Sequence, residues 1–462
     1  MKKPVFDFVD KSNMSLLTDF YELTMCQGYF ENRRTETATF DLFIRRLPSN
    51  RSYFVFAGLE QALLFLQSIR FTHEQIDYLR TRALSEGFLD YVEDFRFTGE
   101  VWAVAEGTVV FPNEPLIRVT APVIEAQIVE TFLLNTVNLQ TMIATKASRV
   151  VCAARSKPVV EFGLRRTQGT DAAMKAARCS YLAGCSGTSN VLAGMVYDIP
   201  VFGTMAHSYV MFFDSEIDAF RAFARVFPDT STLLIDTYDD LAGAENAAIV
   251  AKELESTGHH LDAVRLDSGD LAEISKKVRA TLDRRGLKYV KIFASGDLDE
   301  YKLEKLVGDG APIDAFGVGT RMSTSSDRPY VDVVYKLSGK VEEDAFVPAM
   351  KLSRGKVTLP GRKHIFRQKD RMNQYKCDVI GFEEESIEGT HLLFKVMENG
   401  KIVADLPTLH EIRETALCNM VELPSQYKKI RNSPRYPVHL SLRLTQATRQ
   451  VTSMLRRTKR VR

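Results

Sequence analysis

The chain has 462 residues, of which 45% are hydrophobic and 26% charged, and its formal net charge is +2. This is the composition of an ordinary folded protein, and the length exceeds what one hydrophobic core supports, so we expect at least two domains. No run of eighteen apolar residues and no apolar signal core occur, so we expect no membrane attachment and a cytoplasmic location. The six cysteines form no CxxC pair, which argues against a disulfide framework or a zinc site.

The first part of the chain, residues 1–130, is predicted to be an α+β segment. Residues 13–30 have the pattern of a helix that Asn13 or Ser15 caps. Tyr21 lies beside the apolar stripe of this helix, where packing is the common role of an aromatic ring and ligand contact the alternative. Further on we expect strands at 38–44 and 53–56, helices at 59–68 and 72–86, and a strand-rich stretch at 100–119.

A long helix is predicted over residues 124–150, with Lys146 and Arg149 near its end. Two interpretations stay open for these cations. They are either solvated charges at a helix terminus or ligands of a phosphate group.

From Pro158 onward the pattern changes to short apolar runs that alternate with helical segments. The runs end near Phe162, Phe202, Ile235, Leu266, Phe293, Phe316 and Val334. Six or seven such units predict a parallel sheet with helices around it. Polar clusters follow almost every run, which favours a closed barrel over a doubly wound sheet, and we assign residues 131–340 to this α/β barrel.

The C-terminal part is predicted to be β-rich at 341–430, with turns at 359–361 and 398–400, and to complete the first domain from the other end of the chain. Residues 421–462 carry eleven Lys or Arg and a single acidic residue, Glu422. An apolar stripe runs through Leu440, Leu444, Ala447, Val451 and Leu455. It predicts that 431–462 form a basic amphipathic helix that docks on the protein or faces a partner, rather than a nucleic-acid-binding tail.

Reactive side chains follow the predicted strands of the barrel, where a parallel α/β domain builds its active site. Glu161 and Arg165 come after the first strand, and Arg265 precedes Asp267. Arginine binds anions through two parallel hydrogen bonds. The carboxylates of Asp267, Asp270 and Asp297 are suited to Mg²⁺ or to ribose hydroxyls.

Two glycine turns and one histidine complete this set. Ser295–Gly296 and 317–320 follow strands and can present backbone N–H groups to phosphate. His207 is the only histidine in these clusters and can serve as acid, base or nucleophile. The chain has no GxxxxGK[ST], HExxH or GxSxG sequence. These residues predict an enzyme that acts on a phosphorylated, Mg²⁺-bound small molecule.

Five motifs, at residues 16–25, 161–166, 203–208, 264–271 and 316–320, together closely resemble those of the nicotinate phosphoribosyltransferases, in the same order and over nearly the whole chain. The resemblance implies a type II phosphoribosyltransferase fold, in which an irregular TIM-like α/β barrel lies beside a β-rich domain built from both chain ends. It also implies a homodimer with shared active sites, and the first step of NAD salvage from nicotinate, phosphoribosyl pyrophosphate and ATP, with Mg²⁺ as cofactor.

The resemblance implies roles for individual residues. His207 matches the histidine that ATP phosphorylates, while Tyr21 from the partner subunit and Phe162 match the two rings that enclose the pyridine. Thr204 and Arg265 match nicotinate contacts, and Arg165, Asp267, Gly296, Gly319 and Thr320 match the phosphoribosyl pyrophosphate region. Asp267 and Asp297 are the candidates for contact with the substrate-bound Mg²⁺.

The choice of base is predicted from Ser189, which follows Gly187 and Thr188. Relatives that use nicotinamide carry an acidic residue directly after the matching Gly-Thr pair. A neutral Ser189 therefore predicts nicotinate as the base. The alternatives are a nicotinamide-specific relative and a catalytically silent scaffold that binds an acidic partner through the basic tail.

Overall fold

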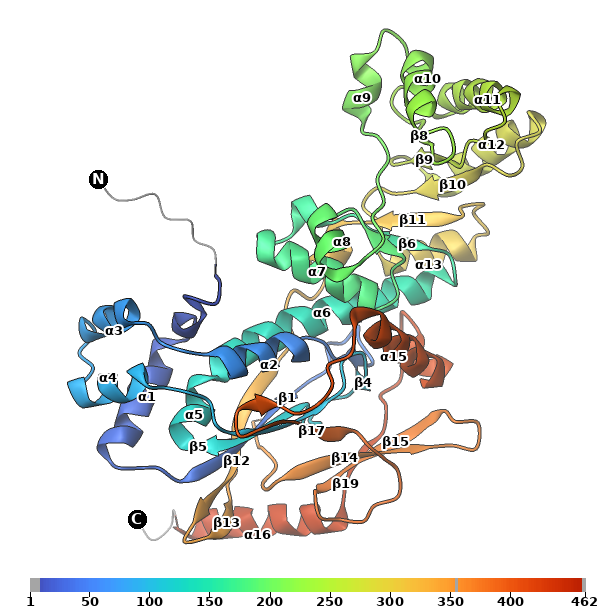
Figure 1. Ribbon diagram of the computed structural model, residues 1–462. Helices are drawn as coiled ribbons and strands as arrows, with labels where there is room; N and C mark the ends of the chain where they lie inside the picture. Colours follow the sequence, from blue (N-terminus) through green and yellow to red (C-terminus); the bar gives the residue numbers. More distant parts are fainter. Residues whose placement is uncertain (1–8, 354–355, 459–462) are drawn as a thin grey trace.

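The computed structural model describes residues 9–353 and 356–458. Figure 1 shows a β-rich half and a parallel α/β half, with the long helix α6 (Glu130–Ala154) between them. In the described part of the chain no helix is long and apolar enough to cross a membrane.

The larger sheet of the β-rich half takes its strands from both ends of the chain. Its order is β13-β12-β1-β5-β3-β17-β18. The strands are β1 (Thr37–Ile44), β3 (Glu100–Val104), β5 (Ile117–Pro122), β12 (Val333–Glu342), β13 (Ala345–Pro348), β17 (Leu393–Glu398) and β18 (Lys401–Ile402). Because β12 pairs antiparallel with β1, the run near Val334 is not a seventh unit of the parallel sheet, and that prediction was wrong.

Helices cover the N-terminal part of this sheet, and two of their predicted boundaries were wrong. The elements are a 3₁₀ turn (Met14–Leu16), α1 (Phe20–Glu31), β2 (Phe54–Val55), α2 (Leu59–Ser68), α3 (His73–Arg80), α4 (Glu86–Glu93), β4 (Val109–Val110) and α5 (Val123–Ile128). The helix expected from residue 13 begins only at Phe20, after Asp19 in extended conformation. The helix expected at 72–86 is two helices, because Thr72 caps the first and Ser85 caps the second.

A second, smaller sheet has the order β16-β14-β15-β19. Its strands are β14 (Lys363–Lys369), β15 (Tyr375–Phe382), β16 (Thr390–His391) and β19 (Val438–Leu440), and α15 (Leu409–Glu422) and a 3₁₀ turn (Ser425–Lys428) precede β19. The tail helix α16 (Leu442–Thr458) packs on β15, where Leu444 is fully buried. Leu440 and Leu455 of the predicted stripe stay more than one third exposed. Residues 459–462 of the predicted tail lie outside the described residues.

The parallel sheet has the order β7-β6-β11-β10-β9-β8. Its strands are β6 (Val159–Glu161), β7 (Gly187–Thr188), β8 (Thr232–Leu234), β9 (Ala263–Leu266), β10 (Lys291–Ala294) and β11 (Ala315–Val318). Val201 adds to the β7 edge through a parallel bridge to Thr188. The strands therefore form a ring in which each strand lies beside the strands that precede and follow it in the chain. Among the described residues, the ring is open at one place, between Val201 and β8, which do not pair. This gap makes the barrel irregular.

The helices of this half connect the strands and lie around them. They are the 3₁₀ turn Leu164–Arg166, α7 (Thr170–Leu182), α8 (Val191–Tyr197), α9 (His207–Phe212), α10 (Glu216–Val226), α11 (Asp240–Ser256), α12 (Leu271–Arg284), α13 (Glu300–Gly308) and α14 (Thr320–Ser323). The apolar run that ends near Phe202 contributes only the single bridge at Val201 to the sheet.

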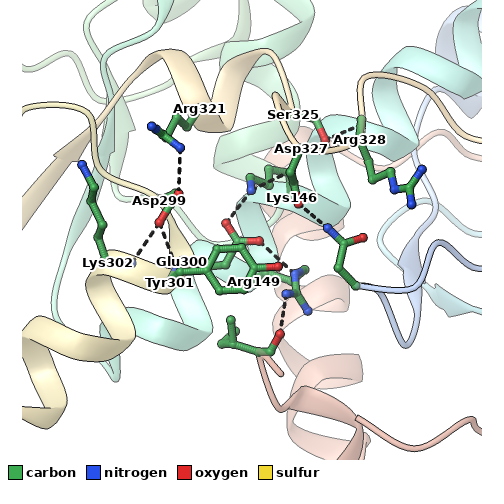
Figure 2. A network of polar contacts seen from close by, with 12 residues as sticks. Lys146, Arg149, Asp299, Glu300, Tyr301, Lys302, Arg321, Ser325, Asp327 and Arg328 are labelled. Atoms are coloured by element: carbon green, nitrogen blue, oxygen red, sulfur yellow. Dashed lines mark hydrogen bonds and ion pairs between the residues drawn. The ribbon is translucent and has the colours of Figure 1, made fainter. Parts of the chain in front are cut away.

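Lys146 and Arg149 lie inside α6 rather than at its end, and each is 1% exposed. Both pair with Glu300 at the start of α13 (Figure 2). Because α6 continues for five residues beyond Arg149 and packs against α13, the two cations are not solvated charges at a helix terminus. They are also not among the residues that line the cavity of the barrel described below.

Arg178 on α7 joins the two halves. Its Nη1 donates to Glu106 Oε1 at 2.8 Å and its Nη2 to Glu60 Oε2 at 2.8 Å, while Gly58 N donates to Glu106 Oε1 at 2.6 Å. Burial by itself raises the pKa of Glu106, but the charge of Arg178 and these hydrogen bonds hold it below its usual value. A buried, fully bonded ion pair thus fixes α7 against the β-rich half.

We expect Arg178→Ala to lower the free energy of unfolding by about 3–5 kcal/mol, because it leaves Glu106 charged and buried without its partner. Urea unfolding of the purified protein measures this. The control is Arg221→Ala, which breaks an exposed pair with Glu253 and costs less than about 1 kcal/mol. Equal losses in the two variants would contradict the assignment.

Candidate functional site

A cavity of about 350 Å³ lies at the carboxyl ends of β6, β9, β10 and β11. Its lining contains most of the residues predicted for the site: Phe162, Arg165, Arg166, Arg265, Asp267, Ser295, Gly296, Asp297, Gly317, Gly319 and Thr320. Polar clusters that are up to 158 positions apart in the sequence therefore meet at one edge of the parallel sheet, as the strand pattern predicted.

Arg265 lines this cavity, and other side chains hold its guanidinium from three directions. Nε donates to Ser295 Oγ at 2.8 Å, Nη1 to Thr204 Oγ1 at 3.0 Å and Nη2 to Asp267 Oδ1 at 2.8 Å. Its guanidinium carbon is 5.6 Å from the ring centre of Phe162. A fixed cation next to an aromatic face is suited to a planar anion.

Asp267 is held in its ionised form. Burial raises its pKa, but the hydrogen bond from Ser295 at 2.5 Å and the charge of Arg265 outweigh burial and hold the pKa below its usual value. Both bonds go to Oδ1. The carboxylate therefore remains charged at neutral pH.

Asp236, at the end of β8, is a site residue that the sequence analysis missed. Its Oδ2 accepts from the backbone N–H of Asp267 at 2.9 Å and from Ser268 Oγ at 2.7 Å. The signal was present in the sequence, because an apolar run at 233–235 stops at this aspartate.

His207 is the first residue of α9, and its Nδ1 lies 3.2 Å from Thr237 Oγ1. It is half-buried. Its Coulombic interaction with Asp267 contributes to lowering the pKa of that carboxyl, so the imidazole lies within electrostatic range of the cavity. Thr237, which orients the ring, was also missed by the sequence analysis.

Two glycines in the cavity lining are required by close backbone approach. Gly296 has φ +94°, and a Cβ there would lie 1.8 Å from Asp267 O. A Cβ at Gly319 would lie 2.9 Å from Phe162 O. Helix α13 begins at Glu300 with Asp299 as its cap, so Gly296 lies in a loop ahead of the first turn.

The predicted metal contacts are already paired with other groups. Arg321 donates to Asp297 at 2.7 and 2.8 Å and lowers its pKa, and Lys302 adds a contact at 3.3 Å. Asp270 caps α12 by accepting from Ala272 N and Glu273 N. In the part of the chain that the structure describes, no three His, Cys, Asp or Glu side chains form a group that could hold a metal ion. A cation here would have to bring oxygen ligands from its own substrate.

Glu161 is a structural residue of the site. Its carboxylate accepts from Gly163 N at 2.5 Å and from the hydroxyls of Thr188 and Ser323 at 2.7 Å each. Its backbone oxygen accepts from Ser189 N at 2.9 Å, which places half-buried Ser189 at the neighbouring strand end. Glu161 therefore holds the ends of β6 and β7 and the end of α14 together.

Tyr21 is not part of this cavity in its own chain. It is 49% exposed on α1, which Figure 1 places beside α4, far from β6 and β11. The strand ends thus collect the other predicted site residues, and Tyr21 belongs to a separate surface.

The chain matches three family models: the nicotinate phosphoribosyltransferase N-terminal domain at residues 16–138, the nicotinate phosphoribosyltransferase family at 158–356 and the C-terminal domain at 385–448. A nicotinate phosphoribosyltransferase of Mycobacterium tuberculosis is 48% identical over 440 residues, which cover 93% of this chain and 92% of the relative. One of Bacillus subtilis is 39% identical over 465 residues and covers 94% of each chain.

Solved structures agree with these matches. The human nicotinic acid phosphoribosyltransferase superposes with a TM-score of 0.81 at 29% identity, covering 94% of this chain and 99% of its own. A nicotinate-nucleotide pyrophosphorylase of Pyrococcus furiosus gives 0.74 at 27% identity, with 91% and 99% covered. These folds pair a barrel with a β-rich domain, as described above. The chain belongs to the nicotinate phosphoribosyltransferase family.

Proposed function

We propose that this chain transfers the phosphoribosyl group of phosphoribosyl pyrophosphate to the ring nitrogen of nicotinate, which yields nicotinate mononucleotide and pyrophosphate and begins NAD salvage. The observation that carries the proposal is the Arg265 guanidinium, fixed against the Phe162 ring at one end of a cavity that Arg165 and two glycine loops complete. The names of the relatives support the same activity.

The two ends of the cavity suit the two substrates. Nicotinate is a flat anion, so its carboxylate pairs with Arg265 and Thr204 while its ring stacks on Phe162. The phosphate groups take donors from Arg165, Thr320 and the backbone around Gly296 and Gly319. A substrate bound in this way presents C1 of the ribose to the pyridine nitrogen.

The reaction depends on charge and position. The lone pair of the pyridine nitrogen needs no base to attack C1, and pyrophosphate leaves as positive charge develops on the ribose. The ionised Asp267 carboxylate stabilises that charge without reorganising, because Arg265 and Ser295 already hold it.

Mg²⁺ fits this donor set as a cation delivered with pyrophosphate. Asp267 and Asp297 would hold it through carboxylate oxygens, Asp297 by exchanging its hydrogen bonds from Arg321, and the substrate would supply the remaining oxygen ligands. When bound, the ion neutralises charge on the leaving group.

ATP is proposed to act through His207. Thr237 orients the imidazole, and the Asp267 carboxylate attracts it toward the cavity, where it would accept the phosphoryl group. A phosphate on His207 adds negative charge beside the developing ribose cation, and its hydrolysis helps to release product.

A second copy of the chain is proposed to complete the site. α8 and the segment after it expose an apolar surface that a monomer would leave in water: Val191, Leu192, Met195, Val196, Val201 and Phe202 are 44–77% exposed. The exposed Tyr21 is the ring that the partner contributes opposite Phe162.

We expect His207→Ala to abolish the stimulation of turnover by ATP and to leave the melting temperature unchanged, because the side chain is only half-buried at the start of α9. Wild-type protein incubated with ATP should carry an acid-labile phosphate that the variant lacks, measured by phosphate labelling. His73→Ala, whose side chain is 93% exposed, is the control. Retention of ATP stimulation in His207→Ala would overturn this role.

We expect Tyr21→Ala to raise the KM for nicotinate by fivefold or more, about 1 kcal/mol of lost ring stacking, and Tyr21→Phe to change it little. Mixed subunits decide where the ring acts. If sites are shared, mixing inactive Arg265→Ala chains with Tyr21→Ala chains restores wild-type KM in about a quarter of the sites. If mixing does not restore the wild-type KM in any sites, Tyr21 acts in the site of its own chain or has only a packing role.

We expect Ser189→Asp to lower kcat/KM for nicotinate by several-fold to a hundredfold, about 1–3 kcal/mol, because the new carboxylate repels that of the substrate. Ser189→Asn, which adds bulk without charge, is the matched control. If Ser189→Asp and Ser189→Asn lower kcat/KM equally, the negative charge is not the cause of the loss.

Product analysis of wild-type protein offered nicotinate, nicotinamide and quinolinate in parallel tests the function itself. Nicotinate mononucleotide should be the main product. Equal turnover of nicotinamide would favour the nicotinamide-specific alternative, and no turnover of any base would favour the scaffold.

A further inference from the structure

A buried cluster of five charged side chains lies where α6 and α13 meet two loops, and Figure 2 shows four of them, Lys146, Arg149, Glu300 and Asp327. Lys146 Nζ lies 2.5 Å and Arg149 Nε 3.1 Å from the Glu300 carboxylate. Arg51 Nη1 lies 2.9 Å from Asp327 and 3.7 Å from Glu300, and Lys146 also contacts Asp327 at 2.8 Å. The cluster is thus one connected network and not a set of separate pairs.

The charges of this network do not balance. Three cations, Arg51, Lys146 and Arg149, face two carboxylates, and the three cationic side chains are at most 3% exposed. Burial raises the pKa of Asp327, but the hydrogen bonds and charges of Arg51 and Lys146 outweigh it and hold the carboxyl ionised. One formal positive charge therefore remains in a poorly solvated place, which is unfavourable unless an anion lies near it.

A cavity of about 270 Å³ adjoins the network at Arg51. Lys429 and Arg431 supply two more cations to its wall, and Ser49, Asn432 and Ser433 supply hydrogen-bonding groups. None of its lining residues is acidic, and the one carboxylate paired with these two cations is the exposed Glu304, 3.6 Å from Arg431 Nε and outside the lining. Lys429 has no hydrogen-bond or ion-pair partner among the described residues, so its ammonium group is available to a ligand.

We propose that this cavity binds a small, multiply charged phosphate anion, inorganic phosphate or pyrophosphate, between Arg51, Lys429 and Arg431. The shape of the wall favours such an ion over a nucleotide. Its one aromatic ring, Tyr301, already has the Arg431 guanidinium 4.8 Å from its centre, so a base would compete with this cation for the ring. The bound anion offsets the positive charge that the network leaves unpaired.

The site is mechanically connected to the barrel cavity. Glu300 is the first residue of α13, and Asp299, its cap, contacts Arg321, which in turn holds Asp297 in the barrel cavity. An anion at Arg51 that changes the Arg51–Glu300 contact therefore acts on the loop that carries Asp297. This coupling, though not the binding, rests on the proposed function.

Isothermal titration calorimetry with pyrophosphate tests the site on the full-length protein without nicotinate or its mononucleotide, so that no turnover contributes heat. We expect Lys429→Ala/Arg431→Ala to bind one pyrophosphate fewer per chain than wild type, or to bind that ion at least tenfold more weakly. Lys305→Ala/Arg435→Ala removes the same charge from exposed residues outside the lining and should match wild type. Unchanged melting temperatures establish that both double variants are folded.

Equal stoichiometry and affinity in wild type and Lys429→Ala/Arg431→Ala would overturn the proposal, as would an equal loss in the control variant. Parallel titrations with inorganic phosphate and a non-hydrolysable nucleoside triphosphate identify the ligand, and a difference seen only with the triphosphate would contradict the small-anion assignment. The comparison holds whether or not pyrophosphate also binds in the barrel cavity, because it measures the difference between variants and not the total number of sites.

Discussion

The catalytic half depends on the hydrogen bonds of one guanidinium, that of Arg265. It joins Thr204, Asp267 and Ser295, three side chains that come from separate strand ends. Each of these bonds also acts on the chemistry: the one to Asp267 keeps a carboxylate ionised, and the one to Thr204 fixes the loop that leads to His207. The orientation of the cation, the charge of the site and the placement of the histidine are therefore coupled.

Sequence periodicity predicted the barrel because each strand end carries a polar cluster, and the structure brings those clusters together. It could not separate β12 from the barrel strands, since an apolar run has the same appearance in a parallel and an antiparallel sheet. Asp236 and Thr237 were missed for a related reason. Their roles depend on contacts with Asp267 and His207, which are about 30 positions away.

Lys146 and Arg149 show that local sequence patterns do not predict whether a charged side chain is buried. A helical pattern with two cations near its end is typical of an exposed terminus, yet the partners of these residues, Glu300 and Asp327, are more than 150 positions further on. Burial of charge is decided by tertiary neighbours, and no window of local sequence contains them. The resemblance to a family fixed the topology, whereas the unbalanced charge of this network became visible only in the structure.

The pairing of β1 with β12 has a consequence for the synthesis of the chain. Ala38 lies opposite Lys340, so one edge of β1 has no partner until about 300 further residues have left the ribosome. Until then the nascent chain exposes an unpaired, apolar strand edge, which is a template for aggregation. The barrel strands, in contrast, are contiguous in sequence between Val159 and Val318. Folding during translation would thus begin in the middle of the chain, and the first domain in sequence would be the last to close.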